Sequence, residues 1–288
     1  MGASLIAWRM TLSFTILGCG SSGGVPRPAL GWGDCNPANP RNRRRRTSLL
    51  VDRHGPAGLT RVLIDTSPDL REQLLDAEVE HLDAVLYTHE HADHTHGIDD
   101  LRGLFIRHRR PVDVYLDEPT ARAVRARFAY CFEAASGSDY PPIATEHRLV
   151  PGQEIVIAGK GGPIRALPIL QAHGDIASLG FRFGAMAYCC DLSGLSDASV
   201  AALAKLDVWI VDALRYRPHP SHFSVDDALS WIDRIKPRRA ILTNLHSDLD
   251  YDELRARLPP HVEPAYDGLR LDLPSLAMAS AAPCINIP

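Results

Sequence analysis

The stretch His89-Glu90-His91-Ala92-Asp93-His94 places three imidazoles and one carboxylate within six residues. It comes two residues after the apolar run Leu82–Leu86, which has the pattern of a buried strand. Imidazole nitrogens together with carboxylate oxygens suit zinc, manganese or iron. A segment this short cannot wrap all four groups around one ion. The first two histidines are therefore expected to bind one divalent metal ion, and the last two residues a second.

Each ion needs further ligands, and three more residues stand where predicted strands end. His173, Asp191 and His246 each follow such a strand. Taken alone, each of these residue types is more often a surface or hydrogen-bonded residue than a metal ligand. Beside the histidine-rich segment, however, they favour a two-metal centre in which the carboxylate of Asp191 could bridge both ions.

The composition of the chain is not typical of a nucleic-acid-binding, membrane or secreted protein. The 288 residues are 45% hydrophobic and carry a formal net charge of −4, so no general basic field indicates a stable nucleic-acid partner. The apolar runs are far shorter than a membrane span, and residues 1–8 lack the pattern of a signal peptide. The six cysteines have no C-x-x-C spacing. We expect a cytoplasmic protein without a membrane partner.

The order of predicted elements indicates two strand-rich halves, each flanked by helices. Two sheets packed face to face with helices on their outer faces bury such elements most economically. This predicts an α/β fold in one domain over residues 10–272. Residues 1–9 are expected to form a flexible extension, and residues 273–288 a peripheral tail.

The order of the ligands resembles that of the metallo-β-lactamase superfamily, most of whose members are metal-dependent hydrolases. The segment Leu63-Ile64-Asp65-Thr66 matches the first acidic motif of that superfamily. The resemblance implies a four-layer αββα sandwich, two bound divalent ions, and an Asp65 that supports the metal loop without binding metal. His96 is expected to pack behind the same loop.

Within the superfamily, the sequence is most similar to the cyclic-phosphate phosphodiesterases of the carbon–phosphorus lyase pathway. That family hydrolyses phosphoribosyl 1,2-cyclic phosphate and accepts 2′,3′-cyclic nucleotides. The resemblance implies that His222 is the general acid and that Asp93 is a catalytic residue as well as a ligand. It also implies zinc as the metal, with manganese as an alternative.

The sequence departs from the family pattern in two places. Cys35 is the single cysteine after the Gly-Trp-Gly turn, and Ser247 stands where the family has a late histidine, so a structural zinc site is not expected. The family's last catalytic ligand directly follows a threonine, but here Asn244 follows Thr243. His246 lies two residues further on, on the same side of an extended strand. Either Asn244 or His246 could complete the second metal site.

The sequence around His222 also supports a catalytic role, independently of the resemblance. Ser224 is a plausible N-cap, with Asp227 at the capping-box position of a helix predicted over 225–235. His222 is thereby placed beside a helix N-terminus, which attracts phosphate oxygens. His219, in the same loop, is the competing acid.

Three residues are candidates for binding substrate: His219, Arg215 and Ser21. The basic run Arg41-Asn42-Arg43-Arg44-Arg45-Arg46 is expected to be a solvated face. The alternative is that one or two of its guanidiniums hold a substrate phosphate.

These features predict hydrolysis of a small phosphorylated substrate or nucleotide, with a hydroxide made available by the ions and a histidine general acid. Three alternatives stay open: a tRNA 3′-processing endoribonuclease, a thioester or lactone hydrolase, and a metal-binding accessory protein without turnover. The sequence also leaves open the native metal and whether the chain forms a homodimer.

Overall fold

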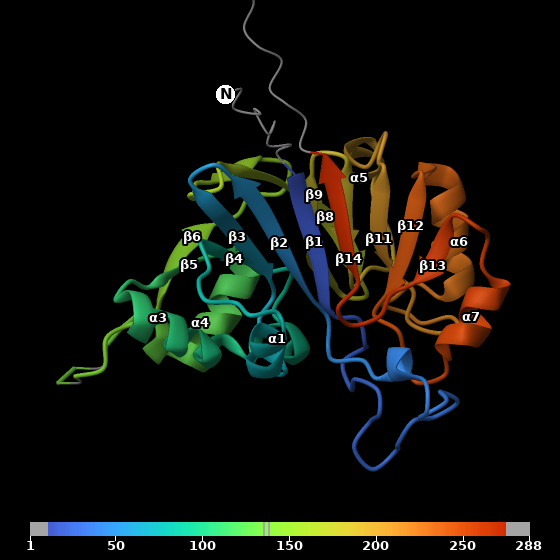
Figure 1. Cartoon of the computed structure of the whole chain (residues 1–288), viewed down its shortest axis with the longest axis horizontal. Helices are drawn as coiled ribbons and strands as arrows, with labels where there is room; N and C mark the ends of the chain where they lie inside the picture. The colour runs from blue at the N-terminus through green and yellow to red at the C-terminus, as the bar shows by residue number, and fades with distance from the viewer. Residues whose placement is uncertain (1–10, 135, 138, 275–288) are drawn as a thin grey trace, which may run out of the picture.

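Short apolar runs become the strands of two seven-stranded sheets (Figure 1). The computed structural model describes residues 11–134, 136–137 and 139–274. The first sheet contains β14 (Arg270–Pro274), β1 (Thr11–Gly18), β2 (Ser48–Gly55), β3 (Gly58–Ile64), β4 (Ala84–Leu86), β5 (Val112–Leu116) and β6 (Ala144–Arg148), in that order. The second contains β13 (Val262–Pro264), β12 (Arg239–Thr243), β11 (Val208–Asp212), β10 (Met186–Cys189), β9 (Ile176–Phe183), β8 (Ile164–His173) and β7 (Ile155–Ile157).

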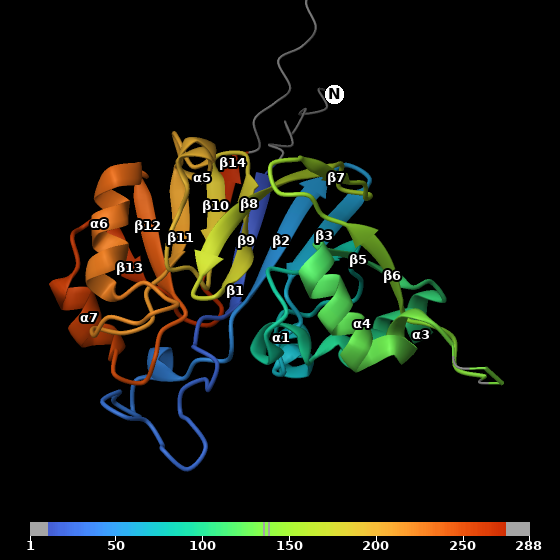
Figure 2. The same cartoon turned by 180° about the vertical axis from the view of Figure 1, so that it is seen from behind.

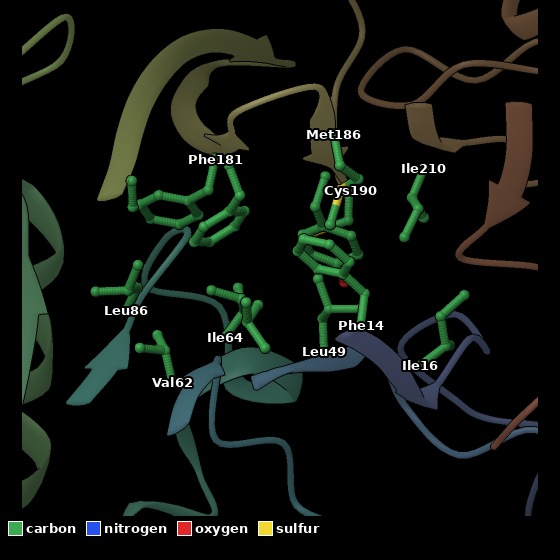
Figure 3. Packing of buried hydrophobic residues seen from close by; sticks show 14 of the residues in the cluster. Phe14, Ile16, Leu49, Val62, Ile64, Leu86, Phe181, Met186, Cys190 and Ile210 are labelled. Carbon is green, nitrogen blue, oxygen red and sulfur yellow. The ribbon is translucent and has the colours of Figure 1, made fainter. Parts of the chain in front are cut away.

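The main core fills the space between the sheets (Figure 3). Alternate residues of a strand point to one face, so Phe14 and Ile16 of β1 face the second sheet together. Their counterparts include Phe181 and Phe183 of β9, and the rings of Phe14 and Phe183 lie 5.9 Å apart. Each such side chain is almost fully buried and contributes about 1.5–3 kcal/mol. This layer supplies the rigidity on which a site at the sheet edge depends.

Helices cover the outer face of each sheet (Figure 2). The first sheet is covered by α1 (Leu70–Asp76), α3 (Arg102–His108) and α4 (Glu118–Phe132). The second is covered by α5 (Asp197–Ala202), α6 (Val225–Ile235) and α7 (Tyr251–Arg257). The short elements α2 (Ala92–Thr95), η1 (Pro40–Asn42) and η2 (Ile98–Leu101) lie in connections. The predicted four-layer αββα sandwich is confirmed. None of the helices in the described part of the chain has the length and apolar character of a membrane span.

Some elements match the sequence prediction and others do not. Helix α6 has the predicted bounds, and both hydrogen bonds of the Ser224–Asp227 capping box are present. Strands β6, β13 and β14 were not predicted. β6 is largely polar and lies at a sheet edge, and β13 has only three residues, so neither carries a clear hydrophobic pattern. β14 ends at Pro274, just past the predicted domain end. The predicted extension at 1–9 and residues 275–288 of the predicted tail lie outside the described residues.

The long connection between β1 and β2 folds beneath the sheets, at the lower edge in Figure 1. It begins at Gly18, where an added Cβ would lie 2.0 Å from the carbonyl oxygen of Arg46. Only a residue without a side chain permits this approach. The carboxyl ends of parallel strands β10, β11 and β12 meet the connection at the same edge.

The basic run forms the expected solvated face only in part, because Arg41 and Arg43 are exposed but the next three arginines are not. The Arg44 side chain is buried and donates hydrogen bonds to the carbonyl oxygens of Leu249 and His246, at 2.7 and 3.2 Å. Arg45 and Arg46 form ion pairs with aspartates of other segments. These guanidiniums join the β1–β2 connection to the rest of the chain, and so are committed to structure rather than to substrate.

Candidate metal centre

The structure brings together the first group of predicted ligands. One ligand atom from each of His89, His91, His173 and Asp191 can be chosen so that all four lie within 4.8 Å of one another. His89 and His91 come from the segment after β4, His173 ends β8, and Asp191 follows β10. Three imidazoles and a carboxylate form a donor set typical of zinc.

A second group shares a member with the first. Asp93, His94 and Asp191 also place one ligand atom each within 4.8 Å of the others. Asp191 Oδ2 lies 3.4 Å from His94 Nε2, 3.6 Å from His173 Nε2 and 3.7 Å from His89 Nε2. This carboxylate therefore lies between the two groups, as a bridging ligand must.

The hydrogen bonds of His89 and His94 leave the Nε2 atom of each ring available for metal. His94 Nδ1 donates to Asp65 Oδ2 at 2.8 Å, and His173 Nδ1 donates to the carbonyl oxygen of Ser221 at 2.7 Å. Asp65 also accepts from the backbone N–H and hydroxyl of Thr88, both at 2.8 Å. His173 Nε2 lies 3.3 Å from His91 Nδ1, whereas Nε2 of His89 and of His94 is buried and has no hydrogen-bond partner among the described residues. Buried orphan acceptors that converge on one carboxylate fit a divalent cation well.

The pKa shifts of the site histidines agree with binding of a divalent cation. Burial, helped by the neighbouring His94, holds the pKa of His89 well below its ordinary value and keeps the ring neutral, as a ligand requires. Burial also opposes protonation of His94, but the carboxylates of Asp191, Asp93 and Asp65 raise its pKa well above the ordinary value. The same groups would stabilise any cation placed there.

Three residues of the site have a left-handed backbone. Asp65, Asp191 and Asn244 have φ values of 62°, 51° and 62°. Asp and Asn are the side-chain-bearing residues that tolerate this region best. Each of these residues lies just past the carboxyl end of a strand, where the left-handed conformation interrupts the extended backbone. The identity of these residues is therefore set by backbone geometry as well as by chemistry.

The structure separates the two candidates for the last ligand. Asn244 lies at the centre, and its Nδ2 donates to Asp191 Oδ1 at 3.0 Å and to Asp212 Oδ1 at 3.1 Å. His246 is not brought to the second group. Its Nε2 accepts a hydrogen bond of 2.6 Å from Arg27 Nη1, and its Nδ1 donates to Asp248 at 3.0 Å. With both ring nitrogens engaged elsewhere, His246 does not complete the second group in this arrangement, which has three protein ligands.

The predicted general acid has a buried partner. His222 Nδ1 donates to Asp212 Oδ2 at 2.8 Å, and Asp212 is fully buried at the end of β11. Burial acts to lower the pKa of His222, but the hydrogen bond and charge of Asp212 outweigh it and raise the pKa to about 8. The competing His219 has a lowered pKa, because of burial and the charges of His222 and Arg215. His222 is thus the ring better able to carry a proton at neutral pH.

A polar cavity of about 380 Å³ opens onto these groups, a size typical of a small-molecule site. It is lined by Ser21, Ser22, Arg27, His91, Asp93, His173, Asp191, Leu214, Arg215, His219, Ser221, His222, Asn244 and His246. The three substrate-binding candidates therefore lie on its wall. His96 does not lie behind the metal loop as expected, since it is exposed and its ring packs against Phe128 of α4.

Sequence reasoning missed three residues of the site. Thr88 hydrogen-bonds Asp65 and approaches His89, Asp212 holds His222, and Arg27 lies on the cavity wall. Asp212 carried a usable signal, a charge that ends the apolar strand Val208–Asp212. No sequence signal pointed to Arg27, because its contact with His246 joins residues far apart in the chain.

Comparisons with known proteins agree with this geometry. The family described as "Beta-lactamase superfamily domain" matches residues 60–244. A crystal structure of "a New Diphosphatase from the PhnP Family" is 35% identical, covers 92% of this chain and 98% of that one, and has a TM-score of 0.82. Zn²⁺-bound PqqB from Methylobacterium extorquens shares the fold at 17% identity, with coverage of 91% and 100% and a TM-score of 0.66.

A curated relative carries a different name. "Octanoyltransferase" from Porphyromonas gingivalis is 35% identical over 259 residues, which is 88% of this chain and 50% of that protein. The chain therefore spans half the length of this relative.

The two groups of ligands should differ in affinity, because the second lacks an imidazole at position 244. We expect stepwise chelation to release one ion first. Asn244→His should hold the second ion at least about tenfold more tightly. Metal analysis after dialysis against graded chelator measures this, with circular dichroism as the check on folding.

The exposed variant Arg43→His is the control, since it adds an imidazole away from the site. Simultaneous loss of both ions from the wild type, or an unchanged release profile in Asn244→His, would contradict the unequal-affinity interpretation.

Proposed function

The chain belongs to the beta-lactamase superfamily and is a metal-dependent hydrolase, and from this premise we propose that it is a two-metal phosphodiesterase. We propose as substrate a small cyclic phosphate or nucleotide-like phosphodiester, such as phosphoribosyl 1,2-cyclic phosphate or a 2′,3′-cyclic nucleotide. We further propose zinc as the metal, with manganese as the alternative. The observation that carries the proposal is the His222–Asp212 pair on the cavity of the metal ligands.

Hydrolysis of a phosphodiester whose leaving group is an alkoxide needs a proton donor for the leaving oxygen. Divalent ions held by the ligand groups would lower the pKa of water and offset charge on phosphate oxygens. His222, protonated and oriented through Nδ1 by Asp212, would donate a proton from Nε2 to the departing alkoxide. Asn244 links this acid to the centre, because its amide donates to both Asp212 and Asp191.

The character of the cavity supports a phosphorylated substrate over an acyl one. Its wall carries two guanidiniums and several imidazoles, and Leu214 is the single large apolar residue among those that line it. Such a wall suits an anion and offers little for an octanoyl chain. The similarity to a diphosphatase points to the same kind of P–O bond chemistry. The net charge of −4 provides no general attraction for tRNA.

A substrate panel with zinc or manganese tests the proposal. We expect hydrolysis of bis(p-nitrophenyl) phosphate and 2′,3′-cyclic AMP, because both present a phosphodiester small enough for the cavity. Pre-tRNA, a glutathione thioester and p-nitrophenyl octanoate serve as competing substrates. Activity confined to the thioester or the octanoate would overturn the phosphodiesterase proposal, and activity confined to pre-tRNA would replace it with the endoribonuclease.

Removal of the acid should matter most where the leaving group is poor. His222→Ala is expected to lower kcat on 2′,3′-cyclic AMP by about 10²–10⁴. The loss on bis(p-nitrophenyl) phosphate should be much smaller, since p-nitrophenolate leaves without a proton. The metal content should not change. His219→Ala is the matched control in the same loop, and an equal loss from His222→Ala on both substrates would exclude the general-acid role.

The pH profile should depend on Asp212. His222 acts while protonated, so kcat/KM for 2′,3′-cyclic AMP should hold below the raised pKa of about 8 and fall as pH rises through it. Asp212→Asn removes the charge that raises this pKa, so the alkaline limb should move toward the ordinary histidine value of about 6.5. Asp226→Asn, an exposed change on α6, is the control. An unmoved limb in Asp212→Asn would show that another group controls it.

A further inference from the structure

Among the described residues, His91 is the histidine of the first ligand group whose ring has no hydrogen-bond partner outside the group. His89 Nδ1 lies 3.0 Å from the hydroxyl of Thr88, and His173 Nδ1 donates to the carbonyl oxygen of Ser221 at 2.7 Å. The ring of His91 contacts only His173, a contact that a bound ion would replace. A metal-binding imidazole is usually oriented by a hydrogen bond to its other nitrogen. The orientation of His91 must therefore be set through its backbone.

The backbone next to His91 is held from outside the metal loop (residues 89–94). The carbonyl oxygen of His91 itself accepts from the backbone N–H of His94 at 3.1 Å and from the hydroxyl of Thr95 at 2.9 Å. The carbonyl oxygen of Glu90 instead accepts a hydrogen bond from Arg127 Nη1, which belongs to α4. This carbonyl and the N–H of His91 are parts of one planar peptide unit. The hydrogen bond from Arg127 thus fixes the plane from which the His91 side chain departs.

Helix α4, which lies on the outer face of the first sheet, is bent where it meets the metal loop (Figure 2). Phe128 has φ of −132° and ψ of 40°, outside the helical region, although the helix has no glycine and its one proline, Pro119, lies at the opposite end. The ring of Phe128 packs against that of His96 at 5.3 Å. Arg127 and Phe128 therefore contact the chain on both sides of α2, at Glu90 before it and at His96 after it.

The Arg127 guanidinium is not used elsewhere in the described part of the chain. Arg122 and Arg125 of the same helix form ion pairs with glutamates, whereas none of the described carboxylates pairs with Arg127. Arg127 is also not among the residues that line the active-site cavity. A charged donor makes a stronger hydrogen bond to a carbonyl oxygen than a neutral one does. The side chain is therefore suited to hold the Glu90 peptide and is not placed to bind substrate.

We propose that Arg127 is a positioning residue for His91, and that it strengthens binding of the ion in the first group by fixing the Glu90–His91 peptide. It acts from outside the metal centre and touches no ligand side chain. The inference concerns metal binding alone, so it does not depend on the substrate assigned under the proposed function.

Competition with a chromophoric zinc chelator tests the proposal. Arg127→Ala should lower the affinity for the tighter of the two ions, which we assign to the first group, by about 10- to 100-fold, the range typical of residues that orient a ligand. The affinity for the weaker ion should change much less, because His91 belongs to the first group. Arg127→Lys retains a charged donor and should restore part of the loss. Arg122→Ala, an exposed change on the same helix, is the matched control.

Unchanged affinity in Arg127→Ala would overturn the proposal, as would an equal loss for both ions or the absence of any recovery in Arg127→Lys.

A double-mutant cycle tests whether Arg127 acts through His91. His91→Ala removes the ligand, so adding Arg127→Ala to it should lower zinc affinity by less than about twofold further. Additive losses in the double variant would show that Arg127 acts by another route and would overturn the proposal.

Thermal unfolding separates positioning from a general structural role. Metal-free Arg127→Ala should have the Tm of the metal-free wild type, and saturation with a fixed excess of zinc should raise its Tm by less. An equal fall in Tm with and without zinc would show that Arg127 merely stabilises the fold, and would overturn the proposal. No substrate is present in these measurements, so failure of the phosphodiesterase proposal would leave their outcome unaffected.

Discussion

The structure depends on a buried carboxylate, Asp191, set among three imidazole nitrogens at the edge of two sheets. Burial of such a group costs several kcal/mol unless it is paired with a cation and hydrogen-bonded. Asn244 donates a hydrogen bond to Oδ1 of this carboxylate, and Nε2 of His94 and of His89 lies 3.4 and 3.7 Å from its Oδ2. The fold therefore stabilises a cavity for positive charge, and the packed layer between the sheets must offset the cost of this arrangement.

The rigidity of that edge comes from contacts between distant segments. Arg44, from the β1–β2 connection, donates to carbonyl oxygens of the loop after β12 and approaches the Sγ atom of Cys35, at 3.8 Å. This guanidinium joins the two segments, and so holds the loop of Arg27 and Ser21 against that of Asn244 and His246.

How much of the site could be predicted depends on how local its contacts are. The segment from His89 to His94 and the capping box of α6 are defined by neighbours in sequence, and their geometry could be read directly. The expectation that residues 244 and 246 share one face of a strand is wrong for a physical reason. The strand does not continue to residue 246, because Asn244 has φ of 62° and ends the extended conformation. A left-handed residue at a strand end breaks the alternation, and the sequence pattern does not show where that happens. Arg27 was missed because its partner, His246, becomes its neighbour only in the folded chain.

The residues at positions 244 and 246 affect both the metal ligands and the cavity wall, because an amide stands at 244 and an imidazole at 246. An imidazole at the former position would complete the second group of ligands, whereas His246 is hydrogen-bonded to Arg27. The first group keeps three imidazoles, a set that suits zinc, while the second offers the carboxylates of Asp93 and Asp191 with one imidazole. Oxygen donors favour harder cations such as manganese or magnesium. A displacement of one imidazole by two residues therefore has two structural consequences. The two groups of ligands differ in chemistry, and His246 lies beside Arg27 on the cavity wall.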